Sequence, residues 1–118
     1  MTNVDINFFR GNSYSRSFNI YGWNRNIDEI YFSVKENEND KNCVLQKYLN
    51  HGLTLMANSD TVKTYNLNID AIDTDNMKVD YDYIFDIKII SGNIKKTIVK
   101  GNLTLESEIT KTQNERGD

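Results

Sequence analysis

Apolar residues in this 118-residue chain recur at every second position rather than at every third or fourth. The clearest segment runs from Val79 to Ile90, where one face carries Tyr81, Tyr83, Phe85, Ile87 and Ile89. Aspartate and lysine occupy much of the opposite face. β-Branched and aromatic residues on one side and polar residues on the other are typical of a half-buried strand. A chain with this alternation is expected to fold as sheets.

Weaker alternation predicts further strands, and one segment predicts a helical turn. The strands are Val4 to Phe9, Tyr14 to Tyr21, Glu29 to Lys35, Cys43 to Leu49, Leu53 to Met56, Lys63 to Ile69 and Ile94 to Glu106. The helical turn is Asp70 to Asn76, capped by Asp70, with Asp73 favoured in its first turn. About seven or eight short strands with regular turn signals predict an all-β, antiparallel β-sandwich. A small closed barrel is the alternative.

The last two long strands are expected to form a hairpin around Ser91-Gly92-Asn93. The apolar residues of both strands have odd sequence numbers. Residues paired across a ladder face the same side of the sheet, so the two sequence numbers of each pair must add up to an even number. A two-residue loop would break this rule. A longer loop instead pairs Phe85 with Val99, Ile87 with Thr97 and Tyr81 with Leu103, and we predict that register unless a bulge intervenes.

Residues 1–106 are expected to form one domain, followed by a polar tail at 107–118 that is flexible or ordered only by a partner. The tail ends in Arg116-Gly117-Asp118. We interpret this integrin-type tripeptide as chance.

Composition argues against several classes of function. The net charge is −3 with no basic run, which argues against nucleic-acid binding. One Cys and one His cannot build a zinc site, a disulfide or a redox pair. No segment approaches the ~18 apolar residues of a membrane span, and the amino terminus lacks the features of a signal peptide. We expect no cofactor, no metal, no nucleic-acid partner and no membrane partner.

Residues that could support catalysis are sparse. His51 lies in a turn-like Asn50-His51-Gly52 and is expected to be exposed. Cys43 is interpreted as a small buried side chain. These features predict that the chain is not an enzyme.

Acidic residues concentrate between 70 and 86. Asp73-Thr74-Asp75-Asn76 resembles the start of a calcium loop, but Lys78 and Ile84 stand where the EF-hand pattern needs Gly and Glu. A looser calcium site between strand ends stays open. The remaining acids are expected on a solvated strand face, where Lys96 and Lys100 of the neighbouring strand relieve their repulsion; they are Asp80, Asp82 and Asp86.

Two surfaces are candidates for binding. The outward face of the final hairpin carries a candidate protein interface, made of Ile84, Ile90, Ile94 and Ile98. A loop from segment 36–43 covering these residues is an equally good interpretation. The second candidate is a glycan-stacking platform of Tyr14, Tyr21 and Trp23. The alternative for Trp23 is a core or edge-covering residue.

Four motifs resemble those of small Ig-like bacteriophage and prophage virion domains. They are Arg10-Gly11-Asn12-Ser13-Tyr14, Ile27 to Lys35, Tyr81 to Ile87, and Lys96 to Leu105. The nearest named group is the amino-terminal Ig-like domain of phage baseplate upper proteins, and the resemblance covers about residues 5–106. Asn12 differs from the acidic residue often present there, and we expect no second domain after the Ig-like one.

The resemblance implies an Ig-like sandwich that acts as a non-enzymatic structural component of a tailed bacteriophage virion. Capsid decoration and a head–tail or baseplate connector are both compatible with it. Its partners would be other virion proteins, self-association stays open, and its location would be the virion, after synthesis in the bacterial cytoplasm. The alternative function is a carbohydrate-binding β-sandwich module.

Overall fold

The computed structural model describes residues 2–107, so the predicted tail, apart from Ser107, and its Arg116-Gly117-Asp118 lie outside the described residues. The strands are β1 (Thr2–Asn3), β2 (Ile6–Phe9), β3 (Tyr14–Tyr21), β4 (Glu29–Lys35), β5 (Leu45–Leu49), β6 (Gly52–Asn58), β7 (Val62–Ile69), β8 (Asp82–Ser91) and β9 (Ile94–Glu106). The 3-10 turn η1 (Ala71–Thr74) precedes β8.

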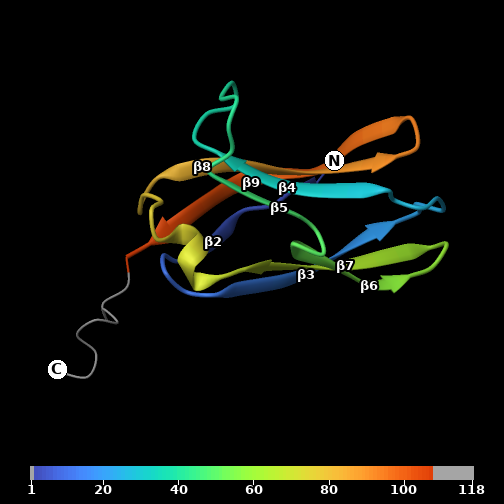
Figure 1. Cartoon of the computed structure of the whole chain (residues 1–118), viewed down its shortest axis with the longest axis horizontal. Coiled ribbons are helices and arrows are strands. Elements are labelled where there is room, and N and C mark those ends of the chain that lie inside the picture. Colours follow the sequence, from blue (N-terminus) through green and yellow to red (C-terminus); the bar gives the residue numbers. More distant parts are fainter. Residues whose placement is uncertain (1, 108–118) are drawn as a thin grey trace.

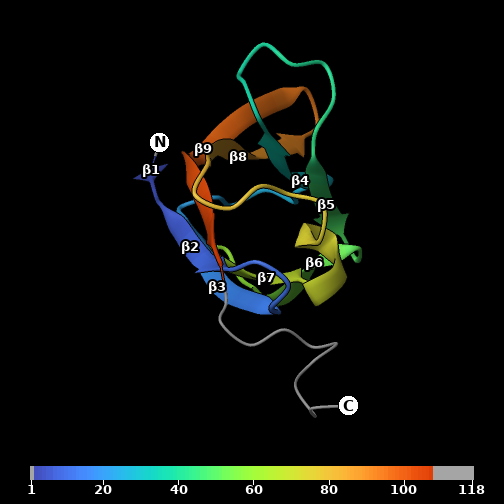
Figure 2. The same ribbon diagram turned by 90° about the vertical axis from the view of Figure 1, so that its left-hand side faces the viewer.

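The strands pack in two layers (Figure 1). One layer has the order β9-β8-β4-β5, and the other has the order β6-β7-β3. Strands β1 and β2 pair with β9 and run along one side of the sandwich, while β5 and β6 meet on the opposite side (Figure 2). The fold is therefore the all-β sandwich that the alternation predicts. It is not a closed barrel, because in the described part of the chain the strand order ends at β3.

The strand order is that of an immunoglobulin-like sandwich, whose two sheets contain the strands named A, B, E, D and C, F, G. Strands β3, β7 and β6 take the places of B, E and D, and β4, β8 and β9 take those of C, F and G. Tyr83 supplies a second signature of this fold. It lies at the start of β8, its side chain is buried, and its hydroxyl accepts a hydrogen bond from the Lys78 N–H at 2.7 Å. This is a tyrosine corner.

Two aromatic rings occupy the centre of the core, where antibody domains place a disulfide and a tryptophan. Phe85 follows Tyr83 by two positions, as the second cysteine does in those domains, and Phe32 lies on β4. Their ring centroids are 5.3 Å apart. Other fully buried side chains come from both layers and include Ile30, Val34, Leu53, Tyr65, Ile69, Ile89, Leu103 and Leu105. Hydrophobic packing thus stabilises the sandwich without a cross-link between the sheets.

The predicted hairpin register is wrong, because the loop is shorter and β9 contains a bulge. Ser91 pairs with Ile94, so Gly92 and Asn93 form a two-residue turn. Gly92 has a φ of +59°, which suits the first central position of a type II′ turn. The register then shifts between Ile87 and Lys88, and beyond this point Ile87 pairs with Val99. The extra residue corrects the parity that the short loop breaks.

The predictions of strand bounds, strand direction and the helical turn were partly confirmed. The bounds of β3 and β4 are confirmed, whereas the expected strand from Val79 begins only at Asp82. The ladders are mainly antiparallel, but β1 and β2 run parallel to β9 and β5 runs parallel to β6. The predicted helical turn is present as η1, with Asp70 at its N-cap position. There the carboxylate of Asp73 accepts a hydrogen bond from the Asp70 N–H at 2.8 Å.

The Arg10-Gly11 motif ties the β2–β3 turn to the segment around η1. The Gly11 N–H donates to the hydroxyl of Thr74 at 2.8 Å, and the Arg10 guanidinium donates to the Met77 carbonyl at 3.2 Å. Thr74 is completely buried. These contacts give the motif a structural role at one end of the sandwich.

Candidate functional site

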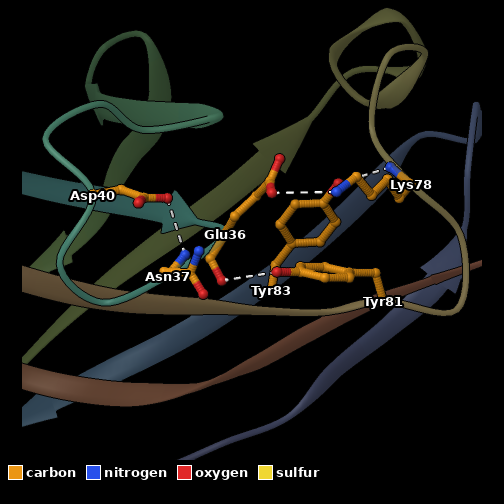
Figure 3. A network of polar contacts seen from close by, with 6 residues as sticks. All are labelled: Glu36, Asn37, Asp40, Lys78, Tyr81 and Tyr83. Carbon is orange, nitrogen blue, oxygen red and sulfur yellow. Dashed lines mark hydrogen bonds and ion pairs between the residues drawn. The ribbon is translucent and has the colours of Figure 1, made fainter.

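The segment between β4 and β5, residues 36–44, projects above the outer face of the β9-β8-β4-β5 layer (Figure 2). We call it the 36–44 loop. Its first residue is held by the segment that leads into β8. The Glu36 carboxylate lies 3.3 Å from the Lys78 ammonium, and the Tyr81 hydroxyl donates to the Glu36 carbonyl at 3.3 Å (Figure 3). The same ammonium lies 4.7 Å from the centre of the Tyr81 ring. The base of the loop therefore has fixed contacts.

The loop also carries its own turn. The Asn37 N–H donates to the Asp40 carboxylate at 3.1 Å, and the Asp40 N–H donates back to the Asn37 carbonyl at 3.1 Å. The Lys35 ammonium, at the end of β4, donates to the Asp40 carbonyl at 2.7 Å. Hydrogen bonds of this kind satisfy backbone groups of a loop that have no partner in a β-ladder.

An ion pair joins the loop to β9. The Lys100 ammonium lies 2.7 Å from the Glu38 carboxylate. The hydrogen bond from Lys100 lowers the pKa of Glu38 below its ordinary value. The reciprocal bond to Glu38 raises the pKa of Lys100. Both side chains are solvent-exposed, so the pair adds little to global stability and acts mainly on the position of the loop.

A hollow of about 270 Å³ lies beside this ion pair on the outer face of the sheet. Its lining combines one aliphatic side chain, charges of both signs and two hydroxyls, from Ser33, Lys35, Glu38, Ile84, Phe85, Asp86, Thr97 and Lys100. Asp86 stands opposite Lys100 across the β8–β9 ladder. We call this the β8–β9 groove. A lining of this composition suits contact with a mixed apolar and polar protein surface.

The four isoleucines of the predicted interface do not share one face. Ile84 lines the groove, and Ile90 follows on the same side of β8; both are partly exposed. Ile94 pairs with Ser91, which is buried and belongs to the inward set of β8. Ile98 lies at the bulge and packs partly against the core. The two-residue turn and the bulge separate the four residues.

The three aromatic residues of the predicted glycan platform are also not brought together. Tyr14 stacks on Phe8 with ring centroids 4.7 Å apart. Tyr21, at the other end of β3, is exposed, and seven steps along a strand place it about 23 Å from Tyr14. Trp23 packs partly against the core, with the Lys96 ammonium 6.0 Å from its ring.

The acidic and nucleophilic residues are dispersed. Asp86 has Lys100 as its cross-strand neighbour, as expected, but Lys96 stands opposite Ile89 and not beside the acids. Residues 2–107 contain no cluster of three or more potential metal ligands. Cys43 is partly exposed, and His51 is exposed with its ring 4.7 Å from that of Tyr48.

The ion pair between Lys100 and Glu38 was missed by sequence reasoning. The only signal for it was the expectation that segment 36–43 could cover the outward face of the hairpin. The structure places Glu38 of that segment on the same groove as Ile84. Which residue of a flexible-looking loop meets which lysine depends on the hairpin register, and that register was predicted incorrectly.

No helix within the described residues is long and apolar enough to cross a membrane.

No protein-family model and no curated protein matches the chain significantly. Among solved structures, the chain is similar to the extracellular fragment, with its stalk region, of Novel Immune-Type Receptor 11 from Ictalurus punctatus. The match has 13% identity and a TM-score of 0.37, over 97% of this chain and 93% of that one. A likeness at this TM-score carries no argument, so the Ig-like assignment rests on the strand order and on Tyr83.

Proposed function

We propose that the chain is a non-enzymatic adhesion module that binds another protein through the β8–β9 groove. The observation that supports this most directly is the groove itself. It is an open hollow beside a loop that three separate contacts hold in place, through Glu36, Glu38 and Asp40. A surface whose loop is held in place before binding loses less conformational entropy on association.

We further propose that the partner is a virion protein of a tailed bacteriophage, and that the chain serves as a capsid decoration protein or as a connector of head, tail or baseplate. Support comes from the resemblance of the Arg10, Ile27, Tyr81 and Lys96 motifs to phage Ig-like domains. Repeated copies on a symmetric particle would make weak individual contacts sufficient through avidity. Its place of action would be the virion.

The first experiment asks whether the protein is part of a particle. Particles are induced from the bacterium that encodes the chain, purified by density gradient and analysed by mass spectrometry. The proposal expects this chain at a fixed ratio to the major capsid or tail proteins. Its absence from intact particles would overturn the phage assignment.

The second experiment asks whether the groove is the binding surface. Ile84→Lys places a charge in the groove, while Ile72→Lys makes the same change at an exposed position on η1, 75% accessible and not among the groove-lining residues. Both variants are first checked for wild-type circular dichroism. We expect particles to incorporate the Ile72→Lys protein normally and the Ile84→Lys protein poorly. Equal incorporation of both would rule out the groove as the contact surface.

A further inference from the structure

The strand β3 forms an open edge of the sandwich. It pairs along its whole length with β7, from Tyr14 opposite Ile69 to Tyr21 opposite Val62, without a bulge. Within residues 2–107 it has no other strand partner, because β1 and β2 pair with β9. An eight-residue strand with one side unpaired is a template on which another strand can add.

The backbone groups that face this open side can be identified. Gly22, just after β3, donates its N–H to the Thr61 carbonyl at 2.9 Å, so residues 22 and 61 form a hydrogen-bonded pair. Such pairs alternate along an antiparallel ladder, so the even-numbered residues of β3 bond to β7. The odd-numbered residues direct their N–H and C=O groups to the open side; they are Ser15, Ser17, Asn19 and Tyr21.

Proline, lysine and a bulge, which often block strand addition, are absent from this edge. One feature that can block addition is present, the charged Arg16 on the inward-facing side of the strand. Beside the edge lies an apolar hollow of about 320 Å³ between β3 and the amino-terminal segment, lined in part by Val4, Ile6, Arg16 and Phe18. A strand that added to β3 would direct alternate side chains over this hollow.

We propose that β3 pairs with β3 of a second copy of this chain, antiparallel and across a twofold axis with Ser17 opposite Ser17. In this register the open groups of the odd-numbered residues meet each other, since Ser15 faces Asn19 of the second copy. The inward set is also compatible: Tyr14 lies opposite Ile20, and Arg16 lies opposite Phe18 of the second copy. Each guanidinium thus gains an aromatic ring as its cross-strand neighbour, and no two like charges stand directly opposite.

The occupant is a second copy because the strand complements itself. A twofold contact needs a surface that matches its own rotated image. In this register the open backbone groups of one strand meet those of the other, inward side chains lie opposite inward side chains, and no like charges are directly opposed. The joint sheet would contain β6, β7 and β3 of both copies. Edge pairing buries far less area than the roughly 1,200–2,000 Å² of a stable interface, so the dimer is weak and depends on concentration.

The test is sedimentation velocity of the full chain over protein concentrations from micromolar to millimolar. We expect the wild type to shift from monomer to dimer as the concentration rises. Ser17→Pro removes an N–H that faces the open side and is not bonded to β7, so the fold should survive. Two hydrogen bonds are lost per dimer, and the dissociation constant should rise about thirtyfold.

Two further variants keep the result interpretable. Ser17→Thr retains the N–H and should dimerise like the wild type. Ser17→Lys retains the fold but places two ammonium groups opposite each other, and should remain monomeric even if Ser17→Pro misfolds. A wild type that stays monomeric throughout, or a dimer that is unaffected by Ser17→Lys, would overturn the proposal. Neither outcome bears on the β8–β9 groove.

Discussion

Tyr83→Phe tests whether the tyrosine corner stabilises this domain. The substitution removes only the hydroxyl that accepts the Lys78 N–H at 2.7 Å, and the ring stays in the core. Loss of an acceptor for a partly buried N–H costs about 1–2 kcal/mol. For a domain of this size, each kcal/mol corresponds to about 4 °C in Tm. We therefore expect Tm to fall by about 4–8 °C.

Tyr81→Phe is the matched control. Its hydroxyl also reaches a main-chain group, the Glu36 carbonyl, but at 3.3 Å and in a half-buried position. We expect a loss of about 0.5 kcal/mol, or about 2 °C. Thermal unfolding followed by circular dichroism measures both variants. If Tyr83→Phe melted with the wild type, or if the two substitutions cost the same, the tyrosine corner would not be a special contact in this fold.

Two further predictions concern β9. Gly101→Ala would place a Cβ against the Val4 carbonyl, so the amino-terminal segment must move away. The Val4 N–H donates to the Lys100 carbonyl, and its hydrogen exchange should therefore accelerate. The amides of β8 should stay protected. The lowered pKa of Glu38 means that its ion pair with Lys100 is complete above the ordinary carboxylate pKa and is lost as the pH falls through the lowered value. An NMR titration should find a lower Glu38 pKa in the wild type than in Lys100→Met, and equal values would contradict this.

The parts of the fold that were predictable are those where burial follows directly from alternation. Strands β3, β4 and β8 each have an inward set recognisable from their residue types, and the turn η1 begins after an aspartate, as helical turns often do. About seven or eight such strands, separated by regular turn signals, correctly predicted an all-β sandwich.

The candidate site was less predictable because its lining depends on the bulge at Ile98, which has no partner on β8. The parity rule correctly identified a conflict between a two-residue loop and the odd-numbered core positions. It resolved the conflict with a longer loop, whereas the protein retains Gly92-Asn93 and inserts a bulge near Ile98. Alternation does not distinguish these solutions, since both restore the facing of Leu103 and Leu105. The position of the bulge decides whether Ile94 and Lys96 face inward or outward. In the structure Ile94 pairs with the inward-facing Ser91, so it does not share a face with Ile84 and Ile90.

We expect the protein to tolerate deletion of Ile98. Without the extra residue, the two-residue turn leads to a regular ladder in which Thr97 still pairs with Lys88 and Val99 still pairs with Ile87. Leu103 and Leu105 keep their places in the core, so the cost is limited to the partly buried Ile98 side chain, about 1–2 kcal/mol. Chemical denaturation measures this loss, and amide NMR contacts report the pairing. An unfolded variant, or one with Leu103 displaced from Tyr83, would show that the bulge does more than correct parity.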